Sequence, residues 1–209
     1  AGRILFALVS SVIIVIVGGG LTFITRPVGS AYLFLWITYW AVQASRQRGQ
    51  PSEYDRRQRL VYLAGIVYVP TLIIIPPWEY VTFSEPIPRD GPLAWFGLAL
   101  FALGIILLAF AMKALGGLYT SHLGIQPMYH LVTNGPYRFV RHPGYLGEIM
   151  SMSGVGISLG SIVGIGLAII SVFLVLKRLQ HEEEMLMTEL GNEYQNYAKR
   201  TKRLIPFIY

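Results

Sequence analysis

The chain of 209 residues is 54% apolar and only 13% charged, whereas soluble globular domains carry about 25% charged residues. This composition excludes an ordinary soluble domain and predicts an integral membrane protein. Cysteine is absent, which excludes disulfides, thiolate metal ligands and a cysteine nucleophile. The net charge of +6 could suit nucleic acid, but basic residues in a membrane protein more often set its orientation, so we expect no nucleic-acid partner.

Several apolar runs can cross a bilayer, which takes about 20 helical residues, or fewer with local thinning. The predicted spans are 4–24, 31–44, 60–75, 93–115 and the two halves of 143–176. The third should bend near Pro70 and stop at Pro76-Pro77. As a single helix, the run 143–176 would be about 50 Å long, whereas the hydrocarbon core is about 30 Å thick. A turn at Leu159-Gly160-Ser161 should therefore divide it into a hairpin.

After the last span, residues 180–199 combine leucines and tyrosines at helical spacing with glutamates between them. This pattern predicts an amphipathic helix that continues out of the membrane. The expected fold is therefore an all-α integral membrane protein with about six membrane helices, short hairpins included, plus a cytoplasmic C-terminal amphipathic helix.

The distribution of basic residues predicts the orientation of the protein. One loop contains Arg46, Arg48, Arg56, Arg57 and Arg59. The loops on the other side contain only Arg26 and Arg89. By the positive-inside rule, both termini, segment 116–142 and the final helix lie on the cytoplasmic face. A multi-pass protein with a cytoplasmic active site is expected.

A dense polar cluster precedes the predicted hairpin. Pro143 suits the first turn of a helix and makes His142 the expected N-cap residue. The amides at this helix start, together with Arg138 and Arg141, can bind a carboxylate or a phosphate. An equally good alternative for the cluster is an arginine pair that binds lipid headgroups.

Small residues recur every three or four positions in the helix that follows: Gly144, Gly147, Ser151, Gly154 and Ser158. This spacing predicts a smooth face for close helix packing. A dinucleotide-binding glycine loop is rejected, because no strand precedes these glycines.

The final helix carries Glu182-Glu183-Glu184 four residues after Arg178. Only some of the three carboxylates can face water, so an inward one could accept the hydroxyls of a ribose while Arg178 holds a substrate carboxylate. Glu148 lies inside a membrane helix, where it is either functional or part of a structural ion pair. His122 and His130 lack nearby carboxylates, and we expect no metal site.

The second half of the chain resembles a known family in an ordered series of motifs. These are Leu131-Val132-Thr133-Asn134-Gly135-Pro136-Tyr137, Arg141-His142-Pro143 with Tyr145 and Gly147, the glutamate run, and Glu193-Tyr194-Gln195-Asn196-Tyr197. The series resembles the isoprenylcysteine carboxyl methyltransferase family, within the wider group that includes phospholipid methyltransferases. The resemblance divides the chain into N-terminal transmembrane helices, 1–112, and a methyltransferase-like catalytic region, 113–209.

The resemblance implies S-adenosylmethionine as the cofactor. It assigns cofactor binding to His122, Gln126, Leu131, Val132, Gly135, Pro136, Tyr137, Arg141, His142, Pro143, Tyr145, Glu183 and Glu184. It assigns catalytic roles to Arg178, Glu183 and Arg141. The implied partners are the lipid bilayer and a lipophilic small molecule or prenylated substrate that enters from it.

The expected reaction is methyl transfer to a lipophilic acceptor, most simply a carboxylate such as that of isoprenylcysteine or a related small lipid. A carboxylate is already ionised at neutral pH and needs no base. Phospholipid N-methylation is an alternative in which Glu148 or one of Glu182 to Glu184 would remove a proton. An NADPH-dependent sterol-type reductase and a non-catalytic lipid-binding protein are two further hypotheses that the sequence leaves open.

Overall fold

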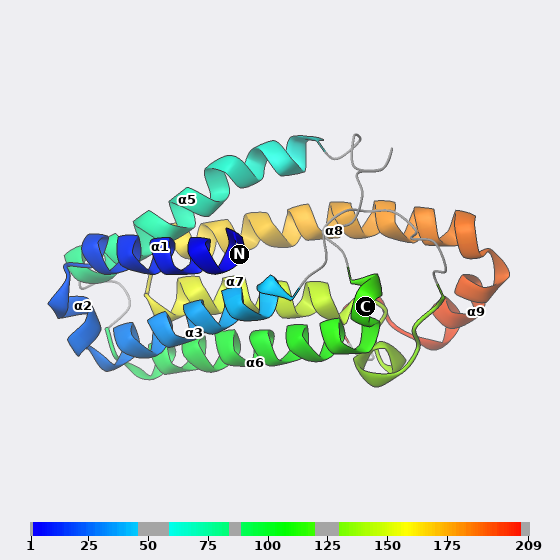
Figure 1. Ribbon diagram of the computed structural model, residues 1–209, viewed down its shortest axis with the longest axis horizontal. Helices are drawn as coiled ribbons and strands as arrows, with labels where there is room; N and C mark the ends of the chain where they lie inside the picture. The colour runs from blue at the N-terminus through cyan, green and yellow to red at the C-terminus, as the bar shows by residue number, and fades with distance from the viewer. Residues whose placement is uncertain (1, 46–58, 84–88, 120–129, 206–209) are drawn as a thin grey trace.

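The computed structural model describes residues 2–45, 59–83, 89–119 and 130–205, and the regular secondary structure in these residues is helical (Figure 1). The helices are α1 (Gly2–Val17), α2 (Leu21–Thr25), α3 (Pro27–Ala44), α5 (Arg59–Thr82), α6 (Pro92–Leu115), α7 (Pro143–Ser158), α8 (Ile162–Leu190) and α9 (Asn192–Arg200). Two short 3₁₀ helices, η1 (Gly116–Leu118) and η2 (Gly135–Arg138), follow α6 and precede α7. The expected all-α fold is confirmed.

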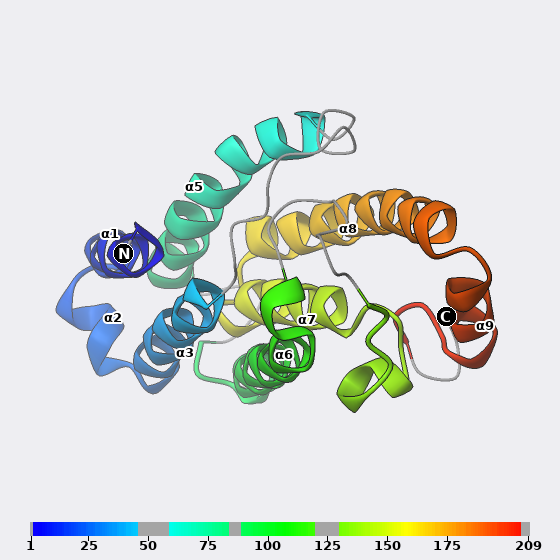
Figure 2. The same cartoon turned by 45° about the vertical axis from the view of Figure 1, so that its right-hand side comes forward.

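Helix α7 lies at the centre of the molecule, between α6 and α8 (Figures 1 and 2). Its interface with α6 is the most extensive in the described bundle, and α3 packs on α6. Helix α1 lies against α3 and α5, while α5 also contacts α8. The core between these helices is rich in aromatic side chains, including the buried Trp36, Tyr32 and Phe101.

The outer surface of the bundle is apolar. Large side chains such as Phe34, Phe110 and Phe173 are exposed on it. Among the described residues, two helices are long and apolar enough to cross a bilayer, over Pro92–Leu118 and Ile162–Leu190. Because soluble monomers rarely expose large contiguous apolar patches, this surface suits contact with lipid.

The small residues of α7 form the predicted packing face, and they face α6. A Cβ atom added at Gly154 would lie 2.5 Å from Phe101 N and 2.7 Å from Gly97 O. One added at Gly147 would lie 2.8 Å from Gly104 O. These neighbours are backbone atoms of α6 and cannot rotate away, so the two helices can approach this closely only where α7 lacks side chains.

The predicted hairpin turn is also present. Gly160 adopts a left-handed backbone conformation with φ +60°, which glycine accepts without strain. Ser161 then caps α8, since its Oγ accepts a hydrogen bond from Gly164 N at 2.7 Å and donates one to Glu79 of α5. The turn therefore reverses the chain and also contacts α5.

Two expected helix boundaries were wrong. The run 4–24 is divided between α1 and α2, because Gly19 and Gly20 adopt φ values of +84° and +65° and end the first helix. Helix α5 continues through Pro76-Pro77 to Thr82 instead of stopping there. Each proline removes its own amide donor and crowds the carbonyl four residues earlier, and membrane helices tolerate such disruptions through local adjustments.

Helix α8 is longer than a membrane span needs to be. Its 29 residues extend over about 44 Å, more than a hydrocarbon core of about 30 Å requires. The C-terminal part of α8, beyond this length, carries the glutamate run past the apolar part of the bundle. Gly191, with φ +51°, then separates α8 from α9, so the expected helix over 180–199 is interrupted at this residue.

Replacing Gly154 by alanine should destabilise the protein by roughly 1 to 3 kcal/mol, since the new methyl group would press against the backbone of α6. Gly166→Ala is the matched control, because nothing lies within 4 Å of an added Cβ there and alanine favours a helix. Thermal unfolding in detergent, followed by tryptophan fluorescence, measures both variants. Equal unfolding temperatures for the two variants would contradict the packing role of Gly154.

Candidate active site

The polar cluster lies at the end of the bundle where α7 begins and where α8 leaves the apolar core. Pro143 is the first residue of α7 and His142 is its N-cap residue, as expected. The His142 side chain makes no capping hydrogen bond. Its Nε2 instead lies 3.2 Å from Oε1 of Glu183, and the ring is buried.

The three consecutive glutamates of α8 point in different directions around the helix. Glu183 is buried with 8% of its surface exposed, Glu182 is half-buried and Glu184 is exposed. The outward Glu184 Oε2 lies 3.5 Å from Nδ1 of His181. Successive helical residues are about 100° apart, so Glu182 and Glu183 can both reach the start of α7 while Glu184 points away from it.

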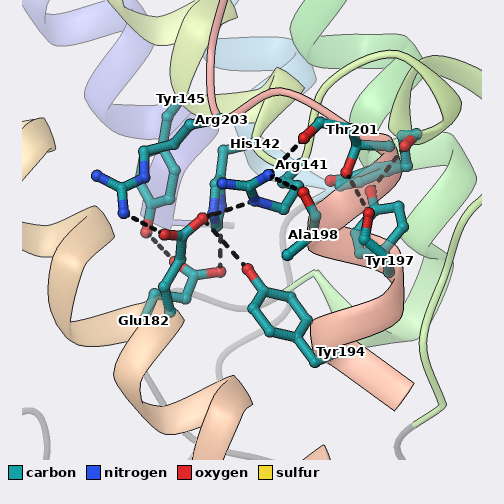
Figure 3. A network of polar contacts seen from close by, with 11 residues as sticks. Arg141, His142, Tyr145, Glu182, Tyr194, Tyr197, Ala198, Thr201 and Arg203 are labelled. Atoms are coloured by element: carbon teal, nitrogen blue, oxygen red, sulfur yellow. Dashed lines mark hydrogen bonds and ion pairs between the residues drawn. The ribbon is translucent and has the colours of Figure 1, made fainter. Parts of the chain in front are cut away.

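Glu183 is the centre of a buried hydrogen-bond network, and its partners Arg141, His142, Tyr194 and Arg203 are labelled in Figure 3. Its Oε1 accepts hydrogen bonds from Arg141 Nε at 2.8 Å and from the Tyr194 hydroxyl at 3.3 Å. Its Oε2 accepts one from Arg203. An ionised carboxylate is costly to bury unless it is paired and hydrogen-bonded, and these contacts meet that requirement.

The segment after α9 lies directly against the start of α7. Arg141 N donates to Lys202 O at 2.7 Å, and His142 N donates to Arg203 O at 3.1 Å. The Arg141 side chain also donates to Thr201 O at 2.5 Å. Backbone and side-chain contacts together therefore hold residues 141–142 against the C-terminal segment.

Sequence reasoning missed Arg203. It lies in a basic stretch with Lys199, Arg200 and Lys202, where nothing distinguishes it from its neighbours. Arg138, which the sequence grouped with Arg141, is exposed, and its Cζ lies 5.0 Å from the ring centroid of Phe139. The guanidinium that joins Arg141 around Glu183 is therefore that of Arg203 and not that of Arg138.

A second polar contact connects α7 and α8 beside this network. The Tyr145 hydroxyl donates to Glu182 Oε2 at 2.6 Å and accepts from Arg178 Nε at 2.7 Å. Arg178 and Glu182 are four residues apart on α8, and Tyr145 bridges them. The hydroxyl thus orients the guanidinium of Arg178. Glu148 lies half-buried one turn further along α7.

The segment 131–137 forms a wall beside the network. Val132 and Tyr137 are buried against Ala111 near the end of α6. The Tyr137 carbonyl accepts a hydrogen bond from the Tyr197 hydroxyl of α9 at 2.7 Å. The wall is therefore held between α6 and α9.

The remaining predicted cofactor residues of this segment have different surroundings. Leu131 packs against the buried side chains at the end of α8 and in α9. Gly135 and Pro136 begin the 3₁₀ helix η2, where Gly135 has φ +56°. His122 and Gln126 lie outside the described residues.

Two tyrosines of α9 remain protonated in this setting. Burial raises the pKa of the Tyr194 phenol, and the charge of Glu183 raises it further. Burial also raises the pKa of Tyr197 to about 12, although the charge of Arg141 opposes this shift. Both hydroxyls are therefore hydrogen-bond donors at neutral pH.

Among the described residues, three guanidinium groups, those of Arg141, Arg178 and Arg203, meet two inward carboxylates, those of Glu182 and Glu183. Guanidinium groups suit a ligand that bears a carboxylate. No group of three or more His, Asp or Glu side chains in the described ranges is arranged to hold a metal ion.

Residues 93–193 match the model of the Phospholipid methyltransferase family. The chain is 33% identical over 142 residues to protein-S-isoprenylcysteine O-methyltransferase B of Arabidopsis thaliana, covering 65% of this chain and 72% of that protein. It is 35% identical over 130 residues to protein-S-isoprenylcysteine O-methyltransferase of Dictyostelium discoideum, covering 59% of this chain and 54% of that protein. The chain thus spans little more than half of the second relative.

The fold also matches a solved structure, that of the eukaryotic intramembrane Ras methyltransferase ICMT (isoprenylcysteine carboxyl methyltransferase). The TM-score is 0.61 at 19% sequence identity, and the match covers 97% of this chain and 74% of that one. Helical architecture, apolar surface and sequence matches together define an integral membrane methyltransferase. The chain belongs to the isoprenylcysteine carboxyl methyltransferase family, as its motifs predicted.

Replacing Glu183 by glutamine should destabilise the protein by about 3 to 5 kcal/mol, because the guanidinium groups of Arg141 and Arg203 would lose their buried counter-charge. Glu184→Gln makes the same chemical change on an exposed side chain and should alter stability by less than about 0.5 kcal/mol. Denaturant unfolding in detergent compares them. Similar stabilities of the two variants would show that the buried network contributes little.

Proposed function

We propose that the protein transfers the methyl group of S-adenosylmethionine to the carboxylate of a lipophilic acceptor that reaches the site from the bilayer. The names of its relatives make an S-isoprenylcysteine the leading acceptor. The observation that carries the proposal is the buried network of Arg141, His142 and Glu183 beside the Tyr145–Arg178 pair. This arrangement places groups that bind carboxylates next to the apolar helices of the bundle. The positive-inside rule, applied to the distribution of basic residues, assigns this end of the bundle to the cytoplasmic face.

The chemistry of these residues fits the cofactor. Arg141, His142 and the amides that follow Pro143 suit its carboxylate, since cations and a helix start both attract anions. The inward carboxylates of Glu182 and Glu183 suit its hydroxyl and ammonium groups, whereas Glu184 points away from the network. The apolar wall 131–137 suits its adenine ring. The predicted contacts of His122 and Gln126 belong to the same proposal. When bound, the cofactor supplies a methyl group that its sulfonium already activates.

Glu183 acts in this proposal as a positioning residue. Its oxygens accept hydrogen bonds from Arg141, His142 and Arg203, which come from two segments of the chain. The carboxylate thereby holds the groups that bind the cofactor at fixed positions. Binding energy is then not spent on ordering long side chains, a cost of about 0.5 to 1.5 kcal/mol for each.

Arg178 is proposed to hold the acceptor carboxylate. That group has an ordinary pKa of about 3.5 and is ionised at neutral pH, so no residue must remove a proton. The protein mainly has to align the reacting groups, which can contribute roughly 7 to 11 kcal/mol. Tyr145 supports this role because its hydroxyl orients the guanidinium of Arg178.

An amine acceptor is the second candidate, favoured by the match of residues 93–193 to the Phospholipid methyltransferase model. An amine must lose a proton, and this requires a base. Glu148, half-buried in α7 one turn after Tyr145, is the candidate for that role. Incubation of a lipid extract with labelled methyl donor, followed by mass spectrometry, identifies which class of molecule gains the label.

Detergent-purified protein should bind S-adenosylmethionine and S-adenosylhomocysteine with micromolar affinity in a calorimetric titration. Arg141→Ala should abolish binding, whereas the exposed Arg138→Ala should not. Folded protein that gives no heat with either compound would refute the cofactor assignment. Heat with NADPH alone would identify a reductase instead.

Replacing Arg178 by glutamine should lower kcat/KM for S-farnesylcysteine by about 10- to 100-fold, the effect expected for losing charge-assisted hydrogen bonds to a carboxylate. Cofactor affinity should be unchanged. The exposed neighbour Lys177, replaced by glutamine, is the control with the same loss of charge. An Arg178 variant that keeps wild-type kcat/KM would remove this residue from the acceptor site.

A further inference from the structure

A second cluster of charged residues lies at the opposite end of the bundle. Arg26 immediately precedes α3, Arg89 and Asp90 precede α6, and Tyr80 lies in the last turns of α5. In Figure 1 these helix ends lie together, far from α9 and the candidate active site. The 24 residues of α6 separate the two ends by about 36 Å, roughly the thickness of a bilayer.

Two arginines share one aromatic ring in this cluster. The Cζ atom of Arg26 lies 5.7 Å from the ring centroid of Tyr80, and that of Arg89 lies 5.9 Å from it. Tyr80 is buried, with only 1% of its surface exposed. Both distances are within the range of cation–π attraction. The ring thus holds two like charges close together.

The described residues provide one carboxylate for these two cations. Asp90 Oδ1 accepts hydrogen bonds from Tyr80 at 3.2 Å and from Val28 N at 3.1 Å, and Oδ2 lies 3.6 Å from Arg26 Nη1. Arg89 Nε donates instead to a neutral group, the Phe83 carbonyl, at 3.1 Å. Among the described side chains of this cluster, positive charge therefore exceeds negative charge. Glu85, in the adjoining sequence, lies outside the described residues.

The electrostatic surroundings increase this excess. Burial and the nearby charge of Arg26 lower the pKa of Arg89, and the interactions with Tyr80 and Asp90 oppose this shift. Helices α3 and α6 begin at this end and direct the positive ends of their dipoles toward it, whereas α5 ends here with the negative end of its dipole. An anion bound between Arg26 and Arg89 would relieve the repulsion.

Exposed aromatic side chains place this cluster at the depth of lipid headgroups. Trp78 and Phe83 of the α5 end and Trp95 and Phe96 of the first turn of α6 are all exposed. Tryptophan collects at membrane–water interfaces because its ring is apolar and its N–H is polar, so Trp78 and Trp95 are the residues that indicate this depth. An anion at this depth is most simply carried by a lipid.

We infer that Arg26 and Arg89 form a binding site for the phosphate of an anionic phospholipid, in the leaflet opposite the candidate active site. Guanidinium groups recognise phosphate through paired hydrogen bonds, and two of them above Tyr80 form a cationic platform for it. This site uses no residue of the proposed methyl-transfer machinery. The site is therefore independent of the proposed function.

Native mass spectrometry of the full chain in detergent tests the site with two lipids that have identical acyl chains, phosphatidylglycerol and phosphatidylcholine. The wild type should retain phosphatidylglycerol preferentially. Arg89→Gln should weaken that binding about fivefold to tenfold, as expected for the loss of one charge-assisted contact, while leaving the Arg26–Asp90 pair intact. Arg200→Gln, the same change on the exposed surface of α9, should retain wild-type preference.

Each result decides for or against the site. Equal retention of the two lipids by the wild type overturns the inference, as does an Arg89→Gln variant that binds phosphatidylglycerol normally. Inorganic phosphate that raises the unfolding temperature as much as the lipid does would overturn the assignment to a headgroup. A loss of preference in Arg89→Gln with preserved unfolding temperature in lipid-free detergent supports the inference, because a general folding defect is then excluded.

Discussion

The charge of Glu183 can lie in the interior because guanidinium groups from two distant segments of the chain reach it. Arg141 is 42 residues away and Arg203 is 20 residues away, and each contacts a different carboxylate oxygen. A buried charge that loses one partner is strongly destabilising, so the network requires all three segments to be present together. The start of α7, the extension of α8 and the chain after α9 therefore form one unit.

The packing of the apolar helices determines where this unit can form. Glycines at the α6–α7 interface allow the two backbones to come into direct contact and fix the position of the first turn of α7. The turn at Gly160 and Ser161 then sets the register of α8 against α7. That register brings Tyr145 to Arg178 and Glu182, and His142 to Glu183.

The matched family region, 93–193, contains α6, α7 and α8 and ends at the start of α9. It includes Arg141 and Glu183 but not Thr201 or Arg203, which complete the network from beyond it. The matched region thus depends on the C-terminal segment to complete this network. The first three helices extend the bundle toward the opposite end, where the arginines around Tyr80 lie.

The sequence by itself determined the features that follow from local chemistry: the apolar runs, the helix start at Pro143, the turn before α8, and the small-residue face of α7. Proline geometry, glycine conformation and hydrophobic periodicity act over a few residues and can be read directly. Only the tertiary structure decided that Arg203 and not Arg138 reaches Glu183, and that Glu184 faces outward. These choices depend on the rotation of α8 and on which distant segments meet, and no local pattern encodes either.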